Sequence, residues 1–102
     1  MENIRILLSC GAGMSSGFLA QKARKAAKKR GLNAKIEAKS ESEVASYLSS
    51  IDILLLGPHY ASQLKEFEKM AAPYNVKVDV IPQKIYATLD GEKLIDFALE
   101  IV

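Results

Sequence analysis

Short apolar runs alternate with helical patterns along this chain, and that alternation limits its fold more than any other feature. Residues 4–9 and 53–56 are apolar almost throughout, as in strands that are covered on both faces of a sheet. Residues 34–39 and 76–80 alternate apolar and charged positions, as in strands with one exposed face. Because a helical pattern follows each run, the sequence predicts an α/β protein with a four-stranded parallel sheet.

The strand patterns also predict the order of the sheet. The two apolar strands should be central and the two alternating strands should be edges, which gives the order 2-1-3-4 with right-handed crossovers. We expect one domain over residues 1–102, a flavodoxin-like three-layer αβα sandwich similar to low-molecular-weight tyrosine phosphatases. Ligands of such sheets bind where the winding reverses, here at the carboxyl ends of the first and third strands.

The helix boundaries and core faces follow from local signals. Ser15 or Ser16 is expected to cap the first helix and Gly31 to end it, and Ser40 and Glu43 have capping-box spacing at the start of the second. Tyr86 is expected in a loop before the last helix. The apolar faces of the four expected helices comprise Phe18, Leu19, Ala23, Ala26 and Ala27; Val44, Ala45, Leu48 and Ile51; Leu64, Phe67, Met70 and Ala71; and Leu94, Ile95, Ala98, Leu99 and Val102.

The composition argues against several classes of protein. A formal net charge of +2 is too small to indicate a nucleic-acid partner. The single cysteine can form no internal disulfide, and the chain opens without a signal-peptide pattern, so nothing favours secretion. The longest strongly apolar run is too short to cross a bilayer. We therefore expect a cytoplasmic protein without direct membrane insertion.

The basic residues are concentrated in the first helical segment, and two explanations remain open. They form either a solvated face near the helix carboxyl terminus, where the helix dipole favours cations, or a docking patch for an acidic partner. The residues concerned are Lys22, Arg24, Lys25, Lys28, Lys29 and Arg30.

The single cysteine, Cys10, opens a glycine-rich turn between the first strand and the first helix. Backbone N–H groups at a helix start have no intrahelical partner, and the helix dipole adds positive potential. Such a turn stabilises a bound anion and favours the thiolate form of a cysteine. Cys10 is therefore the candidate nucleophile, and the candidate phosphate-binding residues are Gly11, Ala12, Gly13, Met14, Ser15, Ser16 and Gly17.

Known glycine-rich and cysteine motifs fit this turn incompletely. A dinucleotide fingerprint beginning at Gly11 requires a glycine at position 16, and a P-loop requires a lysine, so we expect no nucleotide. Phosphatases of the C-x5-R type require an arginine at the same position, which is Ser16 here. Without that guanidinium the loop can accept a phosphoryl group but should hydrolyse it poorly, which is suited to a relay.

Three further residues are candidates for the surroundings of Cys10. His59 follows the third strand and could be the base of a Cys/His pair, or it could cap a helix or face solvent. Tyr60 and Tyr86 could flank the site or cover the edge of the core. The hydroxyls of Ser15 and Ser16 could contact phosphate or only cap the helix, and Met14 could pack in the core or dock a partner.

Residues 6–16, 52–58, Ile85-Tyr86 and Asp90-Gly91 resemble the lactose/cellobiose-type IIB components of the phosphoenolpyruvate-dependent sugar phosphotransferase system. The resemblance implies that Cys10 is phosphorylated, that residues 11–17 cradle the phosphate, and that Tyr86 lies near this loop. It also implies a IIA phosphohistidine as donor and a sugar on the membrane IIC protein as acceptor, with no metal or cofactor. His59 departs from the family pattern, so the resemblance gives it no role.

Two other classes remain as alternatives. A small cysteine phosphatase or arsenate reductase would explain Cys10, but the arginine at position 16 and a second, resolving cysteine are both missing. A non-catalytic interaction domain of flavodoxin-like shape would leave Cys10 unexplained.

Overall fold

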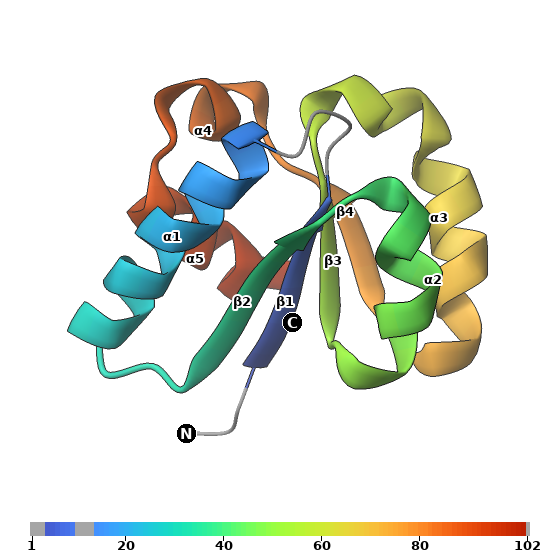
Figure 1. Cartoon of the computed structure of the whole chain (residues 1–102), viewed down its shortest axis with the longest axis horizontal. Helices are drawn as coiled ribbons and strands as arrows, with labels where there is room; N and C mark the ends of the chain where they lie inside the picture. Colours follow the sequence, from blue (N-terminus) through green and yellow to red (C-terminus); the bar gives the residue numbers. More distant parts are fainter. Residues whose placement is uncertain (1–3, 10–13, 102) are drawn as a thin grey trace.

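A four-stranded parallel sheet with the strand order β2-β1-β3-β4 forms the centre of the molecule (Figure 1). The computed structural model describes residues 4–9 and 14–101. The two apolar strands are central and the two alternating strands are edges, so the predicted order is confirmed. The strands are β1 (Ile4–Ser9), β2 (Ala34–Lys39), β3 (Ile53–Leu56) and β4 (Lys77–Val80).

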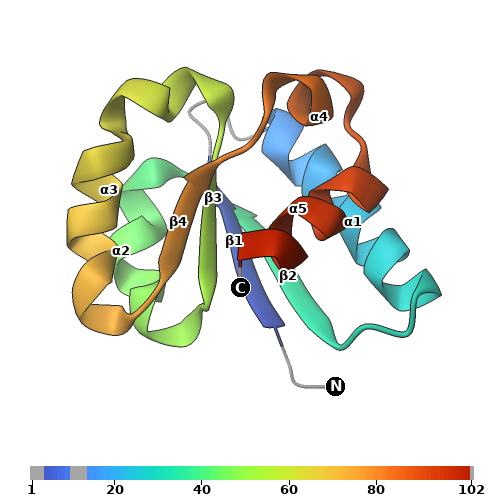
Figure 2. The same ribbon diagram turned by 180° about the vertical axis from the view of Figure 1, so that it is seen from behind.

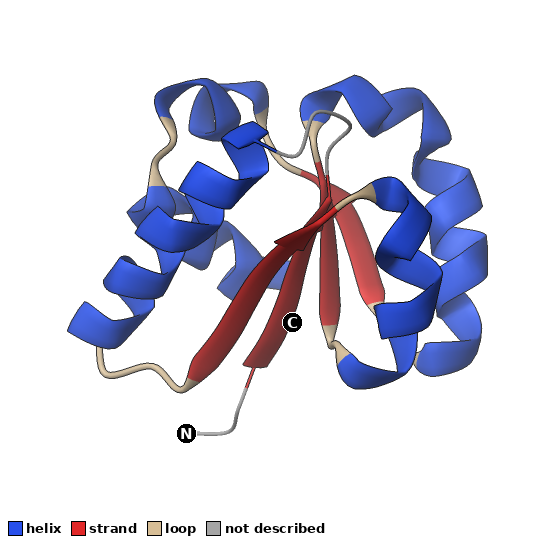
Figure 3. Cartoon of the chain, viewed as in Figure 1, coloured by secondary structure: helices blue, strands red, loops and turns tan. Residues whose placement is uncertain are grey.

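Helices cover both faces of this sheet, which confirms the predicted three-layer architecture (Figures 1 and 2). One face is covered by α1 (Met14–Lys29), α4 (Gln83–Thr88) and α5 (Gly91–Ile101). The other face is covered by α2 (Val44–Tyr47) and α3 (Leu64–Ala71). Short 3-10 segments extend the helices of this second face: η1 (Glu41–Glu43), η2 (Leu48–Ser50), η3 (Pro58–Gln63) and η4 (Ala72–Tyr74). They appear as helical turns in Figure 3.

The alternation of side chains along β1 divides the core into two clusters. Ile6 and Leu8 belong to the cluster beneath α1 and α5, whereas Leu7 belongs to the cluster beneath α2 and α3. All three side chains are buried. A central strand that is covered on both faces is therefore apolar at successive positions, as its sequence indicated.

Two predicted helix boundaries are confirmed and one is wrong. Gly31 adopts a positive φ of 71°, and the N–H of Leu32 donates to the carbonyl of Ala27, which ends α1 in a Schellman motif. The carboxylate of Glu43 accepts a hydrogen bond from the backbone N–H of Ser40, as the capping-box spacing predicts. However, α1 begins at Met14, so Ser15 and Ser16 lie inside its first turn and are not its cap.

The predicted core faces were too wide. The buried stripe of α1 consists of Leu19, Ala20, Ala23, Ala26 and Ala27, and Phe18 lies beside this stripe with 56% of its surface exposed. Ala45, Met70 and Leu99 are exposed in the same way at the borders of their helices. Because α1 meets the sheet mainly through alanines, only a narrow stripe of the helix is covered.

The expected second helix and the segment before the last helix also differ from the predictions. The expected second helix is divided into η1, α2 and η2, although Val44, Leu48 and Ile51 are buried as predicted. Tyr86 lies in the short helix α4 and not in a loop. This helix begins after Pro82 and ends at Leu89, which adopts a left-handed conformation with a φ of 51°.

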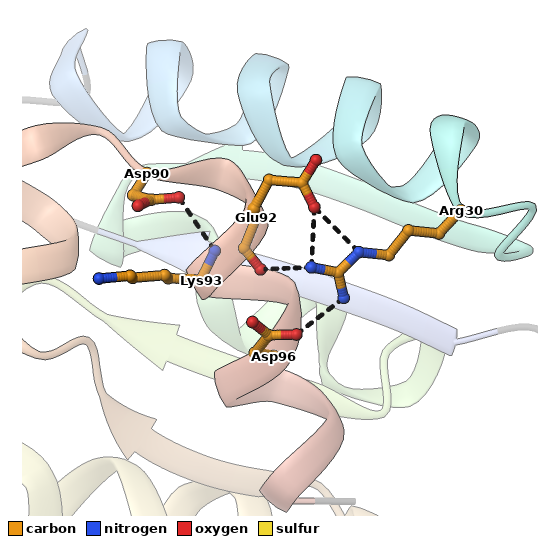
Figure 4. A network of polar contacts seen from close by, with 5 residues as sticks. All are labelled: Arg30, Asp90, Glu92, Lys93 and Asp96. Atoms are coloured by element: carbon orange, nitrogen blue, oxygen red, sulfur yellow. Dashed lines mark hydrogen bonds and ion pairs between the residues drawn. The ribbon is translucent and has the colours of Figure 1, made fainter.

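The carboxyl end of α1 is fastened to α5 by Arg30 (Figure 4). Its guanidinium forms ion pairs with Glu92 at 2.7 Å and with Asp96 at 2.8 Å. Upstream, the two helices nearly touch, because a Cβ atom built on Gly91 would lie 2.4 Å from the carbonyl carbon of Lys22. Only glycine permits this approach, which holds the start of α5 against the middle of α1.

Candidate functional site

The carboxyl ends of the two central strands lie side by side (Figure 3). We call this end of the sheet, where its parallel strands finish, the carboxyl edge. Ser9, the last residue of β1, pairs with Leu56, the last residue of β3, and its carbonyl accepts a hydrogen bond of 2.8 Å from the N–H of Gly57. β2 lies on one side of β1 and β3 on the other, so the winding reverses here. The sequence placed the candidate site at this reversal point.

The candidate nucleophile itself is not among the residues that the structure describes. Cys10 and the cradle residues Gly11, Ala12 and Gly13 fall between the two described ranges, so their roles stay predictions. The backbone of Met14, Ser15, Ser16 and Gly17 forms the first turn of α1. The N–H groups of these four residues are the ones that an α-helix leaves without intrahelical partners, which agrees with their predicted role as anion donors.

Three aromatic rings gather at the same edge. The ring centroids of His59 and Tyr60 are 4.7 Å apart, and those of His59 and Tyr86 are 6.2 Å apart. His59 and Tyr60 come from η3 and Tyr86 comes from α4, so residues on opposite faces of the sheet meet here. The structure thus brings together the three side chains that the sequence singled out as neighbours of the site, although it does not test their roles.

The alternatives for these rings can be partly separated. The N-cap residue of η3 is Gly57, and His59 is exposed inside η3, which favours the solvent-facing interpretation over a capping role. Tyr60 is 6% exposed and packs in the core cluster with Phe67, so it covers the core edge. Tyr86 is half-buried and packs against both core clusters.

Ser9 is a residue of this edge that the sequence analysis did not single out. It is a buried polar residue with 0% exposure, and its Oγ has no hydrogen-bond partner among the described residues. Burying a hydroxyl without a partner costs about 1–3 kcal/mol. The available signal was a polar residue after the apolar run of residues 6–8, directly before the cysteine.

The basic residues of the first helical segment divide into two groups. The arginines make contacts within the fold, because Arg24 donates to the carbonyl of Ile36 at 2.6 Å and Arg30 pairs with α5. The lysines Lys22, Lys25, Lys28 and Lys29 are exposed. The arginines therefore have partners within the fold, whereas the exposed lysines fit both a solvated face and a docking patch.

A shallow groove of about 380 Å³ lies between this basic helix and the start of α5. Lys22, Lys25 and Lys29 line one side, and Asp90 and Glu92 line the other. Both carboxylates already have partners, since Asp90 accepts the backbone N–H of Lys93 at 3.0 Å and Glu92 accepts from Arg30 (Figure 4). The three lysines, by contrast, form no ion pair with any residue of the described ranges.

At the other end of the central strands, the amino edge of the sheet, a carboxylate joins β1 to the residue before β3. Asp52 precedes β3 and accepts hydrogen bonds from the backbone N–H of Arg5 at 2.9 Å and from its Nε at 3.2 Å and Nη2 at 3.1 Å. Hydrogen bonding from the Arg5 guanidinium lowers the pKa of the Asp52 carboxyl, and the same contact raises the pKa of Arg5.

Within residues 4–9 and 14–101, no group of three or more histidine, cysteine, aspartate or glutamate side chains is placed to hold a metal ion. Over the same residues, none of the helices has the length and hydropathy that a membrane span requires.

Comparison with known proteins decides the family. The model of the family described as "PTS system, Lactose/Cellobiose specific IIB subunit" matches residues 5–97. The chain belongs to this IIB family. It is 33% identical to the oligo-beta-mannoside-specific EIIB component of Bacillus subtilis over 98 residues, which cover 96% of this chain and 95% of the relative.

Solved structures agree with this assignment. The cellobiose-specific IIB component of Borrelia burgdorferi superposes with a TM-score of 0.79 at 34% identity, over 98% of this chain and 92% of that one. The lactose-specific IIB domain of Streptococcus pneumoniae superposes with a TM-score of 0.89 over 98% of both chains. Because the latter identity is 18%, it supports the fold alone. Both comparisons agree with the predicted flavodoxin-like α/β fold.

The family also gives the general function and one class of partner. IIB components are phosphotransferases of sugar-transporting phosphotransferase systems, and they work with IIC sugar transporters. The name of the lactose-specific EIICB component of Lacticaseibacillus casei indicates that IIC and IIB are parts of one protein there. That protein is 26% identical to this IIB chain over 98 residues, which cover 94% of this chain and 17% of the relative.

Proposed function

We propose that this IIB component is a cytoplasmic phosphocarrier that uses Cys10 as its phosphorylated residue. Cys10 takes a phosphoryl group from a phosphohistidine of a IIA protein and passes it to a sugar bound by the membrane IIC protein. The sugar class is a β-linked disaccharide, which is supported by relatives named for oligo-β-mannosides and cellobiose.

Both steps transfer one phosphoryl group between nucleophiles. In the first, the thiolate sulfur attacks phosphorus, an S–P bond forms, the P–N bond breaks, and the histidine nitrogen leaves with the electron pair. In the second, the oxygen of a sugar hydroxyl attacks phosphorus, an O–P bond forms and the S–P bond breaks. The sulfur leaves as a thiolate with the electron pair, and the hydroxyl proton passes to solvent. Neither step requires a metal, a nucleotide or an oxidant.

One observation carries the proposal: the single cysteine of the chain directly follows β1 at the reversal point of the sheet. The 16-residue helix α1 begins four residues later, and the unpaired N–H groups of its first turn favour an anion. A thiolate or a phosphoryl group after β1 would therefore be stabilised by donors that the fold supplies without side chains. Residues 11–17 would supply these donors.

The residue at position 16 explains why a carrier is favoured over a hydrolase. Ser16 stands where cysteine phosphatases have the arginine that stabilises charge during phosphoryl transfer to water. The same group would shorten the lifetime of a phosphocysteine. A carrier without it retains the phosphoryl group until the sugar-loaded transporter arrives.

The lysines of α1 provide a docking surface for the phosphodonor. Lys22, Lys25 and Lys29 line a groove whose acidic residues are already paired, so these three positive charges remain available to a partner with an acidic rim. The exposed ring of Phe18 lies one turn before Lys22, at the end of α1 nearest Cys10, and would provide an apolar contact.

A phosphorylation assay tests the proposal. The protein is incubated with phosphoenolpyruvate, the general phosphotransferase proteins and a cognate IIA, and the intact mass is measured. We expect an increase of one phosphate, and its complete loss in Cys10→Ser with an unchanged circular dichroism spectrum. Transfer to sugar should then require membranes that contain IIC.

Two outcomes would contradict the proposal. Absence of the adduct in the wild-type protein would favour a non-catalytic interaction domain. Release of inorganic phosphate without sugar, or turnover of p-nitrophenyl phosphate at ordinary phosphatase rates, would favour a small cysteine phosphatase.

A further inference from the structure

We propose that the IIC transporter docks, through a basic cytoplasmic segment, in a groove between η1 and α3. This groove has a volume of about 310 Å³ and lies on the face of the sheet opposite α1 (Figure 1). The inference rests on the proposed function, because it takes IIC as the phosphoryl acceptor. The residues that line the groove are Glu41, Ser42, Gln63, Glu66, Phe67 and Met70.

The first support is an apolar surface on one face of α3. Gln63, Glu66, Phe67 and Met70 are spaced at i, i+3, i+4 and i+7, so their side chains share that face. Phe67 is 5% exposed and belongs to the core, whereas the apolar side chain of Met70 is 42% exposed. A methionine is flexible, so this side chain can adapt to an apolar residue of a partner.

The second support is the charge of the groove. The described charged residues that line it, Glu41 and Glu66, are both acidic and exposed. Neither carboxylate forms an ion pair with another residue in the described part of the chain. Lys65 and Lys69 of α3 are not lining residues, and their spacing places them on the opposite face of the helix. The groove therefore fits a partner that carries cations beside apolar side chains.

A membrane transporter supplies a partner of this kind. Cytoplasmic loops of membrane proteins carry an excess of lysine and arginine. Such loops would be repelled by Lys22, Lys25 and Lys29 on α1 and attracted by the two carboxylates of the groove. Because the proposed donor surface is basic, surfaces of opposite charge would direct IIA and IIC to different faces of the protein.

The third support is that one end of the groove lies beside the carboxyl edge. Glu41 is two residues beyond the end of β2, and η3 leads from the end of β3 to Gln63. A transporter segment in the groove would therefore be held next to the edge at which transfer is proposed, on the face away from the donor. The two partners could then use the same edge in turn while each keeps its own docking surface.

The experiment measures binding to inverted membrane vesicles with and without the cognate IIC protein, by cosedimentation. The double variant Glu41→Gln/Glu66→Gln should raise the Kd for IIC vesicles roughly threefold to tenfold at low salt. The difference should shrink in about 0.5 M NaCl, where charges are screened. Met70→Ala should weaken binding at both salt concentrations, because it removes an apolar contact. Phosphorylation of these variants by IIA should stay within about twofold of the wild type.

Two matched variants serve as controls. Glu68→Gln/Glu100→Gln makes the same change in net charge at exposed positions that do not line the groove, and it should bind IIC vesicles as the wild type does. Replacing Lys22, Lys25 and Lys29 by glutamine should slow transfer from IIA but should not weaken binding to IIC vesicles. Urea unfolding of each variant checks that the fold is retained.

Several outcomes would overturn the inference. Equal binding of the wild type to vesicles with and without IIC would do so, as would wild-type affinity in the groove variants or an equal loss in the control pair of glutamates. Slower transfer from IIA in the groove variants would assign the groove to the donor. Self-association of the wild type, seen by sedimentation equilibrium and lost in these variants, would assign the groove to a second copy of this chain.

Failure of the proposed function would give a different result. The cosedimentation assay requires no phosphoryl group on the protein. Groove-dependent binding to IIC vesicles, without a phosphate adduct in the wild type, would therefore support the docking surface and reject the phosphocarrier. A phosphate adduct without groove-dependent binding would do the reverse.

Discussion

Polar groups at the two ends of the central strands differ in whether they have hydrogen-bond partners. At the amino edge of the sheet, Asp52 before β3 accepts three hydrogen bonds from Arg5 in β1. At the carboxyl edge, the Oγ of Ser9 has no partner within the described part of the chain, and the rings of His59 and Tyr86 converge there. The central strands therefore have a hydrogen-bonded ion pair at their amino edge. At their carboxyl edge they have a buried hydroxyl without a partner among the described residues.

This difference indicates that polar residues at the amino edge stabilise the fold, whereas those at the carboxyl edge belong to the candidate site. Contacts at the amino edge fix the register of β1 against β3, because Asp52 also donates its backbone N–H to the carbonyl of Arg5 at 2.8 Å. At the carboxyl edge, the Oγ of Ser9 is buried without such a contact among the described residues. Substitutions of polar residues at the amino edge should change stability without changing reactivity, and those at the carboxyl edge should do the reverse.

The largest effect is expected from a substitution at the contact between α1 and α5, which lies outside both edges and supports one face of the sheet. Gly91→Ala would place a Cβ atom 2.4 Å from the carbonyl carbon of Lys22 and 2.6 Å from the backbone nitrogen of Ala23. Because backbone atoms cannot move aside cheaply, α5 must shift away from α1, and we expect a loss of about 3 kcal/mol or more. Urea unfolding measures this loss.

The matched control is Gly17→Ala near the start of α1. A Cβ atom there would meet nothing within 4 Å, so this substitution should leave the free energy of unfolding unchanged or raise it slightly. Equal stability of the two variants would show that the close approach of the helices is not limiting.

The next effect separates docking from the chemistry of the carboxyl edge. Replacing Lys22, Lys25 and Lys29 by glutamine should slow phosphoryl transfer from IIA roughly tenfold at low salt, because electrostatic steering is lost. The difference should shrink in about 0.5 M NaCl, where charges are screened. The rate at which iodoacetamide alkylates the single cysteine, Cys10, should not change at any pH.

The comparison set for this variant removes the same charge elsewhere. Lys65, Lys69 and Lys77 are exposed and lie on α3 and β4. Their replacement by glutamine should leave transfer rates within about twofold, as expected for surface charges distant from the docking site. Equal slowing in both triple variants would attribute the effect to net charge and would argue against the α1 surface.

The smallest effect concerns the amino edge. Asp52→Asn should lower the free energy of unfolding by about 1 kcal/mol at pH 7, since the carboxylate is partly exposed, and should leave phosphoryl transfer unchanged. The folded-state pKa of Asp52 is lowered, so its stabilisation is present above the unfolded value of about 3.9 and is lost as the pH falls through the folded value.

Urea unfolding at pH 7 and in acid tests this assignment. The difference between wild type and Asp52→Asn should disappear below the folded-state pKa, where both carry a neutral side chain. A difference that persisted there would mean that the hydrogen bonds act independently of charge. Slower transfer in this variant would contradict the proposed division between the two edges.

Most of the fold could be predicted because its determinants are local. The strand ends at Ser9, Lys39 and Leu56 follow from apolar runs bounded by polar or glycine residues. The end of α1 follows from the positive φ of Gly31, a conformation that glycine adopts without strain. The position of the candidate site followed from strand order, which the two strand patterns predict.

The missed features depend on contacts between distant segments. Phe18 fits a helical stripe in sequence, but the width of the covered stripe depends on how closely alanines let α1 approach its neighbours. Arg30 looked like one cation of a basic helix, yet its partner Glu92 is 62 residues away. In the sequence Ser9 is only a polar residue at the end of a mostly apolar strand, and the burial of its hydroxyl depends on the two neighbouring strands.

The packing of α1 against α5 also constrains when the site can form. Arg30 and Gly91 join the helix that follows the cysteine loop to the last helix of the fold. During synthesis, α1 therefore lacks its covering helix until α5 has left the ribosome. Cys10 is therefore synthesised well before the helix that holds α1 in place, and α1 becomes fixed only after α5 has been made.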